Sequence, residues 1–270
     1  MMLSGIPATS LWALRAKAEE HSKPEGLFKD PLAAKWYHQA QPLFTPEVQE
    51  QYSRTLQRAI AIRTHILDRL VNRHFQTYPN GALLELGCGF STRFARLNLN
   101  TGHWYDLDLP ELIELRGSLG FPAAPLHWHI AHSVFEYEWL DYLKQEKPEE
   151  MLILAEGLLM YFPLNQVREL LGQLQGHFKG AHLAFDVMGQ LNLKAAQRAA
   201  LELDSPIYWG AKNTENICAE LGLTPAGDLS LSAQMRKEPA YHTGISLLGR
   251  GLLNWSWLSQ QMGGTVLAQL

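Results

Sequence analysis

The spacing of apolar residues changes near residue 80 of this 270-residue chain. Before that point apolar side chains recur every three or four residues, as at Ile60, Leu67 and Leu70, which is typical of amphipathic helices. After it, short apolar runs alternate with helix-like stretches, which is typical of strands buried on both faces of a parallel sheet. The pattern predicts an α/β fold in which a helical section, residues 1–78, packs on an α/β domain, residues 79–270.

Capping signals place the helix starts of the first section. Asp30-Pro31 and Thr45-Pro46 each put an N-cap side chain before a proline at the first helical position. We expect a helix from each, after a first helix that carries Leu11 to Ala18. A longer amphipathic helix is predicted from about residue 48 to residue 75, and Tyr78 to Gly81 ends the section with a turn.

The second section predicts a doubly wound, mostly parallel sheet of seven strands. Met151 to Ala155 is the expected central strand, because a strand that is apolar throughout must be covered on both faces. The predicted strands cover residues 82–86, 103–107, 126–131, 151–155, 181–185, 229–231 and 265–270. Predicted helices follow near residues 93, 110, 139, 164, 194, 213 and 252.

Polar residues follow five successive predicted strands. In an open α/β sheet, ligands bind at the carboxyl ends of the strands, near the point where the strand order reverses. The polar groups at these ends come from the glycine turn after the first strand and from Asp108, Ser133, Glu156 and Asp186. Because parallel strands end at one edge of the sheet, we expect these groups to meet around one ligand.

The glycine turn indicates the kind of ligand. Gly87 and Gly89 let a ligand approach the backbone, and the helix after them directs free N–H groups to the same place. A dinucleotide site has a third glycine where this chain has Thr92, and Glu85 is unfavourable beside a pyrophosphate. S-adenosylmethionine has no phosphate, its cationic end tolerates acids, and its ribose diol suits a carboxylate such as Asp108. We therefore favour S-adenosylmethionine, with an NAD(P)-dependent Rossmann oxidoreductase as the alternative.

Four ordered motifs resemble those of the leucine carboxyl methyltransferase family. They are Glu85 to Arg93, Tyr105 to Glu111, Ser133 to Phe135 with Trp139-Leu140, and Ala155 to Tyr161. Upstream, Leu14 to Ala16, Asp30-Pro31 and Arg63-Thr64 are similar to its N-terminal section. The match runs from about residue 10 to residue 190. It resembles the branch of tetracenomycin-type polyketide O-methyltransferases more closely than the enzyme that methylates a protein C-terminus.

The resemblance implies a class I methyltransferase sheet with Rossmann-like topology, and it implies roles for individual residues. Arg63, and with it Arg15, is expected to pair with the carboxylate of S-adenosylmethionine. The acid of the second motif is expected to bind the ribose, the third motif to hold the adenine, and the acid of the fourth to lie by the methionine part. For Arg93 two roles stay open, a contact with the cofactor and an ion pair at the surface. The implied cofactor contacts are Arg15, Arg63, Glu85, Gly87, Gly89, Asp108, Leu109, Ser133, Val134 and Glu156.

The implied reaction is methyl transfer to a carboxylate or hydroxyl oxygen of a polyketide-like small molecule, or to a protein C-terminus. A carboxylate is already ionised near pH 7 and needs no base, whereas a phenol or alcohol benefits from one. The candidates for that base are His132, Tyr161 and Asp186. Residues 189–262 are expected to supply the acceptor side, including the aromatic residues Tyr208, Trp209, Trp255 and Trp257. A catalytically silent binding module is a further alternative.

Composition and charge narrow the set of partners. A net charge of −4 without a long basic run argues against nucleic-acid binding, and the chain holds no apolar window long enough to span a membrane. Cys88 and Cys218 lie far apart, which favours a reduced, cytoplasmic setting. His127, His129 and His132 have the spacing of metal ligands, but no carboxylate or cysteine cluster lies near them in sequence, so we expect no metal site. The sequence does not fix the oligomeric state, and a homodimer is one alternative.

Overall fold

The computed structural model describes residues 6–230, 233–234, 237–242 and 263–270. Its centre is a seven-stranded sheet in the order β3-β2-β1-β4-β5-β7-β6. The strands are β1 Ala82–Leu86, β2 His103–Asp108, β3 His127–Ala131, β4 Met151–Ala155, β5 His182–Met188, β6 Thr224–Gly227 and β7 Gly263–Gln269. Strands β1 to β5 run parallel, and β7 lies antiparallel between β5 and β6. The predicted doubly wound, mostly parallel sheet is confirmed.

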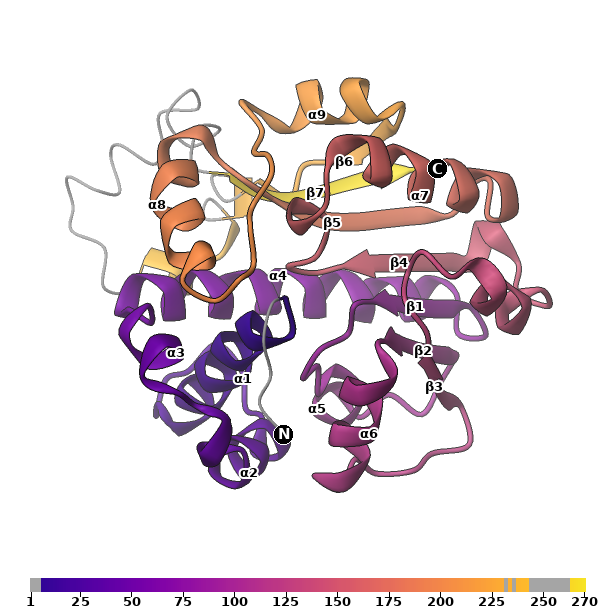
Figure 1. Ribbon diagram of the computed structural model, residues 1–270. Coiled ribbons are helices and arrows are strands. Elements are labelled where there is room, and N and C mark those ends of the chain that lie inside the picture. The colour runs from indigo at the N-terminus through magenta and orange to yellow at the C-terminus, as the bar shows by residue number, and fades with distance from the viewer. Residues whose placement is uncertain (1–5, 231–232, 235–236, 243–262) are drawn as a thin grey trace.

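The helices alternate with the strands along the second section and precede them in the first (Figure 1). They are α1 Ile6–Ser22, α2 Pro31–Gln39, α3 Pro46–Glu50, α4 Arg54–Thr77, α5 Arg93–Leu97, α6 Pro110–Ser118, α7 Leu164–His177, α8 Gln190–Leu201 and α9 Thr214–Leu221. Short 3₁₀ helices cover Gln41–Leu43, Tyr137–Leu143, Pro148–Glu150, Leu159–Tyr161 and Pro239–His242. No helix of the described ranges is long and apolar enough to cross a membrane.

The capping signals hold, with one correction. The Asp30 carboxylate accepts from the Ala33 N–H at 2.9 Å, which begins α2 where predicted. The predicted helix from 48 to 75 is wrong at its start, because α3 ends at Glu50 and α4 begins at Arg54. The Ser53 hydroxyl accepts from the Leu56 N–H at 3.1 Å, and this N-cap fixes the later start.

Two predicted strands differ from the observed ones. Strand β5 continues to Met188, so Asp186 lies inside the strand, paired in register with Thr265 of β7. The sixth strand is β6, residues 224–227, rather than 229–231; all four residues of β6 are exposed, so this edge strand leaves no apolar pattern in the sequence. Leu231 and the predicted helix 252–262, with Trp255 and Trp257, lie outside the described residues.

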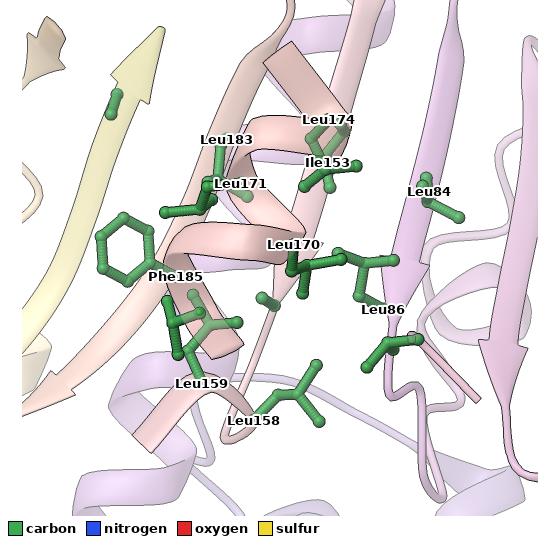
Figure 2. Packing of buried hydrophobic residues seen from close by; sticks show 14 of the residues in the cluster. Leu84, Leu86, Ile153, Leu158, Leu159, Leu170, Leu171, Leu174, Leu183 and Phe185 are labelled. Carbon is green, nitrogen blue, oxygen red and sulfur yellow. The ribbon is translucent and has the colours of Figure 1, made fainter. Parts of the chain in front are cut away.

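Alternate residues of the central strands supply two apolar layers. Leu84, Ile153 and Leu183 face one layer, which Figure 2 shows packed beneath the leucines of α7. Leu83 and Leu152 face the other, which α4 covers with residues such as Ile66, Leu67 and Val71. The period of two along each strand therefore sends neighbouring residues to opposite faces of the sheet.

A third cluster joins the N-terminal helices to the sheet. Leu14 of α1 and Trp36 of α2 pack in one group with Phe90, which follows the glycine turn, and with Leu112 of α6. Figure 1 shows α1, α2 and α3 gathered together beside the lower part of the sheet. This packing brings α1 to the edge where β1 and β2 end. The division at residue 78 into two sections stays a prediction.

Candidate active site

A cavity of about 260 Å³ lies at the carboxyl ends of β1, β2 and β4. That volume is slightly below the roughly 300–1,000 Å³ that is typical of small-molecule sites. Helix α1 forms one wall, the turn after β1 the floor, and the segments after β2, β3 and β4 the remaining sides. The predicted residues that line the cavity are Arg63, Glu85, Gly87, Gly89, Asp108, Leu109, His132, Ser133, Val134 and Glu156.

The turn after β1 requires both of its glycines. Gly87 has φ of 60° and Gly89 has φ of 50°, values that side chains rarely adopt. A Cβ atom on Gly87 would lie 2.6 Å from Leu158 Cδ1, and one on Gly89 would lie 3.2 Å from Ser10 Cβ. The turn is therefore packed closely on both sides and presents bare backbone to the cavity.

Asp108, at the end of β2, is fixed by backbone N–H groups. Its Oδ2 accepts from the Gly89 N–H at 2.6 Å, and its Oδ1 accepts from the Leu109 N–H at 2.8 Å. Burial raises the pKa of Asp108, and the two N–H groups oppose that rise. Each oxygen keeps a further lone pair, so the carboxylate can accept from a pair of ligand hydroxyls.

Arg63 of α4 enters the cavity wall between two carboxylates. Its Nε donates to Glu156 Oε1 at 2.9 Å, and its Nη1 donates to Asp186 Oδ2 at 2.8 Å. Asp186 also accepts from the Gly157 N–H, so each of its carboxylate oxygens already accepts a hydrogen bond. Two of the five N–H groups of the guanidinium are used in these ion pairs, and a ligand carboxylate can take others.

Arg93 lies under the glycine turn and is 2% exposed. Its three nitrogens donate to Asp68 at 2.9 Å, to Glu85, and to Glu156 Oε2 at 2.6 Å. A surface ion pair for Arg93 is therefore wrong. Burial acts to raise the pKa of Glu156, but Arg63 and Arg93 outweigh it and hold that pKa well below its usual range. Glu85 lines the cavity as a carboxylate already paired with Arg93.

Lys17 of α1 is a cavity residue that the sequence reading missed. It is buried, and its Nζ donates to the Phe90 carbonyl oxygen at 2.8 Å. Burial lowers its pKa to about 8. The sequence feature that could have identified Lys17 is its spacing: it lies three residues after Leu14, on the buried face of α1.

Arg15, by contrast, does not line the cavity. Its Nε donates to Glu19 at 2.8 Å, and its guanidinium lies 4.0 Å from the centre of the Tyr52 ring. Residues two apart on a helix point in nearly opposite directions, so Arg15 and Lys17 cannot both face the cavity. Lys17 therefore lines the cavity and Arg15 lies outside it, while the cofactor contact expected of Arg15 stays a prediction.

The remaining predicted residues divide between the cavity and its surroundings. Ser133 and Val134 line the cavity, and the Ser133 N–H donates to Glu136 at 2.9 Å. His132 also lines it and is part-exposed, with Nδ1 3.6 Å from Glu136. Tyr161, on the 3₁₀ helix Leu159–Tyr161, is not among the lining residues, and burial raises its pKa. Of the three candidate bases, His132 is the one that the structure brings to the cavity.

The edge strand β3 holds a cluster that the sequence did not predict. His127 and His129 share a face of β3, and Asp106 of β2 lies beside them, with the possible ligand atoms within 4.8 Å of one another. Arg116 already donates to Asp106. His132 is not part of the group, and the expectation that the chain binds no metal stays a prediction.

Comparisons with known proteins agree with this geometry. A family model described as leucine carboxyl methyltransferase matches residues 8–175. The tetracenomycin polyketide synthesis O-methyltransferase of Streptomyces glaucescens is 27% identical over 218 residues, which cover 80% of this chain and 78% of the relative. An S-adenosyl-L-methionine-dependent methyltransferase of Gibberella zeae is 25% identical over 212 residues, 70% of this chain and 68% of the relative.

Solved structures share the fold. A crystal structure from Thermobifida fusca, described as a candidate methyltransferase, aligns with a TM-score of 0.58 over 98% of this chain and 94% of that one. The magnesium protoporphyrin IX methyltransferase of Synechocystis aligns with a TM-score of 0.51 over 86% of this chain and 98% of that one. Identities of 14% and 9% make these likenesses evidence of the fold alone.

Proposed function

The chain belongs to the leucine carboxyl methyltransferase family and is an S-adenosylmethionine-dependent methyltransferase, and from this premise we propose that it methylates an oxygen atom of a small-molecule acceptor. The observation that carries the proposal is the cavity itself. It offers a carboxylate, Asp108, at the end of β2, and a cation, Arg63, which is fixed by its ion pairs with Glu156 and Asp186.

The cavity residues fit the parts of S-adenosylmethionine. Arg63 and Lys17 would bind the carboxylate of the methionine part, and Asp108 would accept from the ribose hydroxyls. Leu109 and Val134 offer apolar surface for the adenine. When bound, S-adenosylmethionine would supply an activated methyl group, carried on a positively charged sulfur that leaves as the neutral thioether of S-adenosylhomocysteine.

The surplus of acids near the glycine turn suits a cationic ligand. We use "ionic cluster" for the linked side chains Asp30, Arg63, Asp68, Glu85, Arg93, Arg96, Glu156 and Asp186. Five carboxylates face three arginines, so the cluster keeps an excess of negative charge. A pyrophosphate would be repelled here, which counts against the NAD(P)-dependent alternative together with Thr92, whose hydroxyl is bound to Asp30 rather than facing a ligand.

The chain contributes alignment and exclusion of water, because the donor is already activated. A carboxylate acceptor needs no base. A phenol needs one, and His132, at the cavity wall, is then the residue to take the proton. A polyketide-like acceptor rests on the name of the Streptomyces glaucescens relative, and a protein C-terminus is the second class. Neither a nucleic acid nor a membrane enters the proposed reaction.

The test separates donor from acceptor. Calorimetric titration with S-adenosylhomocysteine and with NADH measures which cofactor binds, and preference for NADH would overturn the assignment. Transfer of labelled methyl from S-adenosylmethionine is then measured on paired aromatic acceptors, one set with carboxylates and one with phenols. Turnover of phenols that is lost in His132→Ala, while turnover of carboxylates is kept, supports a base. Binding of S-adenosylhomocysteine with no transfer to either set would favour the silent module.

A further inference from the structure

The flexible residue of the glycine turn, Gly89, is held through both of its peptide groups. Its N–H, in the peptide before it, donates to Asp108 Oδ2 at 2.6 Å. Its carbonyl oxygen, in the peptide after it, accepts from Arg116 Nη1 at 2.8 Å. Holding both neighbouring peptides fixes φ and ψ of a residue that has no side chain to restrict them.

Arg116 is itself immobilised. It is 0% exposed, and its Nη2 donates to Asp106. The guanidinium lies 4.9 Å from the centre of the Phe121 ring, and its Nη1 is also 2.9 Å from Cys88 Sγ. A planar guanidinium can bridge two acceptors with separate nitrogens, whereas an ammonium is a single point charge.

The placement is costly for a residue that only fills space. A buried arginine loses its hydration, and it is stabilised here by one carboxylate, with Nε lacking a hydrogen-bond partner among the described residues. An apolar side chain of similar volume would pack between the aromatic rings at less cost. The bond to the Gly89 carbonyl is therefore the feature that such a residue could not supply.

Both contacts that hold Gly89 lead back to acidic residues of the same strand, β2. Asp106 and Asp108 lie two apart on β2, so their side chains point to the same face. Asp108 binds the Gly89 N–H, and Asp106 binds the arginine that binds the Gly89 carbonyl. His127 Nε2 of β3 also lies 2.9 Å from Asp106 Oδ2.

We propose that Arg116 is a positioning residue for the methyl-donor site, where it holds the Gly89 carbonyl and so keeps the turn and Asp108 in the shape that binds S-adenosylmethionine. The proposal rests on the proposed function, because it takes the cavity over Gly89 as the donor site. Arg116 would touch no ligand atom, since Cys88 and Gly89 lie between it and the cavity.

The test compares donor affinity with stability. Arg116→Met and Arg116→Lys are titrated with S-adenosylhomocysteine, and their melting temperatures are measured. Leu170→Ala serves as a matched control, because it destabilises the opposite side of the sheet without touching the turn. We expect Arg116→Met to weaken binding by about 10- to 100-fold and Arg116→Lys by about 3- to 10-fold, while Leu170→Ala melts earlier and binds as the wild type does.

A double-mutant cycle adds a readout that general destabilisation would not move. If Arg116 acts through the turn that Asp108 also holds, the losses in Arg116→Met and Asp108→Asn must not add. Additive losses within about twofold, or wild-type affinity in either Arg116 variant, would overturn the positioning role. Should Arg116→Met fail to fold, Arg116→Lys carries the same cycle. Failure of the wild type to bind S-adenosylhomocysteine would overturn the donor site instead, so the two failures are distinguishable.

Discussion

Two buried regions of the molecule are held together by contacts of opposite kinds. On the α7 side of the sheet, Leu170, Leu171 and Phe185 belong to a cluster of apolar side chains alone (Figure 2). On the other side, around the ends of β1 and β4, the ionic cluster buries paired charges. The apolar contacts are non-directional and depend on volume, so one hydrophobic side chain can replace another. The ionic contacts depend on each partner, because a charge left unpaired in the interior has no substitute for water.

The two regions contribute differently to stability and to the shape of the cavity. The apolar region makes the sheet rigid but reaches the cavity through few side chains. The ionic cluster ties the start of α2, the middle of α4, the start of α5 and the end of β4 to the glycine turn. Any change to a charge in it is therefore expected to alter both folding and the cavity. A change to an apolar side chain that does not line the cavity, such as Leu170, is expected to alter folding alone.

The largest effect is expected from Arg93→Met. The side chain pairs with Asp68, Glu85 and Glu156, and its loss leaves these buried carboxylates without their shared cation. The expected loss of unfolding free energy is about 3–5 kcal/mol, measured by urea denaturation. Arg168→Met is the control, because its ion pair with Glu220 is about half exposed and should contribute about 0–1 kcal/mol. Equal losses in the two variants would show that the ionic cluster is not a structural unit.

Leu170→Ala probes the apolar region. Leu170 is fully buried in the cluster beneath α7, and truncation leaves a cavity that the packed sheet cannot fill. A loss of about 3 kcal/mol in unfolding free energy is expected, with the affinity for S-adenosylhomocysteine unchanged within about twofold. Leu170→Met should lose less than about 1.5 kcal/mol, since volume is kept. A clear loss of affinity in Leu170→Ala would contradict the separation of the two regions.

The contrast between apolar and ionic contacts also explains which features the sequence could predict. Apolar spacing located the five parallel strands and their neighbouring helices, because Met151 to Ala155 and the runs like it are local patterns. The capping residues Asp30 and Thr45 were also readable, since a cap is made by residues three apart. The edge strand β6 was misplaced because its residues are exposed and its pairing with β7 is distant in sequence.

The charged residues were only half readable. Asp108 and Glu156 stand at strand ends, so their meeting at one edge followed from the topology. The burial of Arg93 did not, since its partners come from α4, β1 and the end of β4 and are 25, 8 and 63 residues away. Whether Arg15 or Lys17 faces the cavity depends on the rotation of α1 against the sheet, which the packing of Leu14 and Trp36 fixes. Pairing across elements is a tertiary property, and a single sequence does not show it.

Asp108→Ala tests the cavity without touching the ionic cluster. Its carboxylate binds two backbone N–H groups and faces the cavity, so truncation removes a charged acceptor from the proposed ribose site. S-adenosylhomocysteine should bind about 10- to 100-fold more weakly by calorimetry. Glu136→Ala is the control, because Glu136 accepts from Ser133 at the rim but is not a lining residue. Wild-type affinity in Asp108→Ala would remove the ribose role.

The smallest expected effect is a dependence of ligand affinity on pH, which arises from the charge of Lys17. Burial lowers the pKa of Lys17 to about 8, so the side chain is charged below that pH and neutral above it. A ligand carboxylate favours the charged form, and affinity should therefore fall as pH rises through 8. Between pH 7 and pH 9 the loss of affinity for S-adenosylhomocysteine is expected to be about tenfold.

Lys17→Met separates this effect from titration of the ligand. The amino group of S-adenosylhomocysteine also loses a proton at alkaline pH, but that change is common to both proteins. The ratio of wild-type to variant affinity therefore isolates the lysine, and it should be largest at pH 7 and approach one above pH 9. Arg63 stays charged across this range: burial acts to lower its pKa, but Asp186 and Glu156 outweigh burial and raise it. A constant ratio would mean that Lys17 holds the Phe90 carbonyl alone, and α1 would then act on the cavity through packing rather than charge.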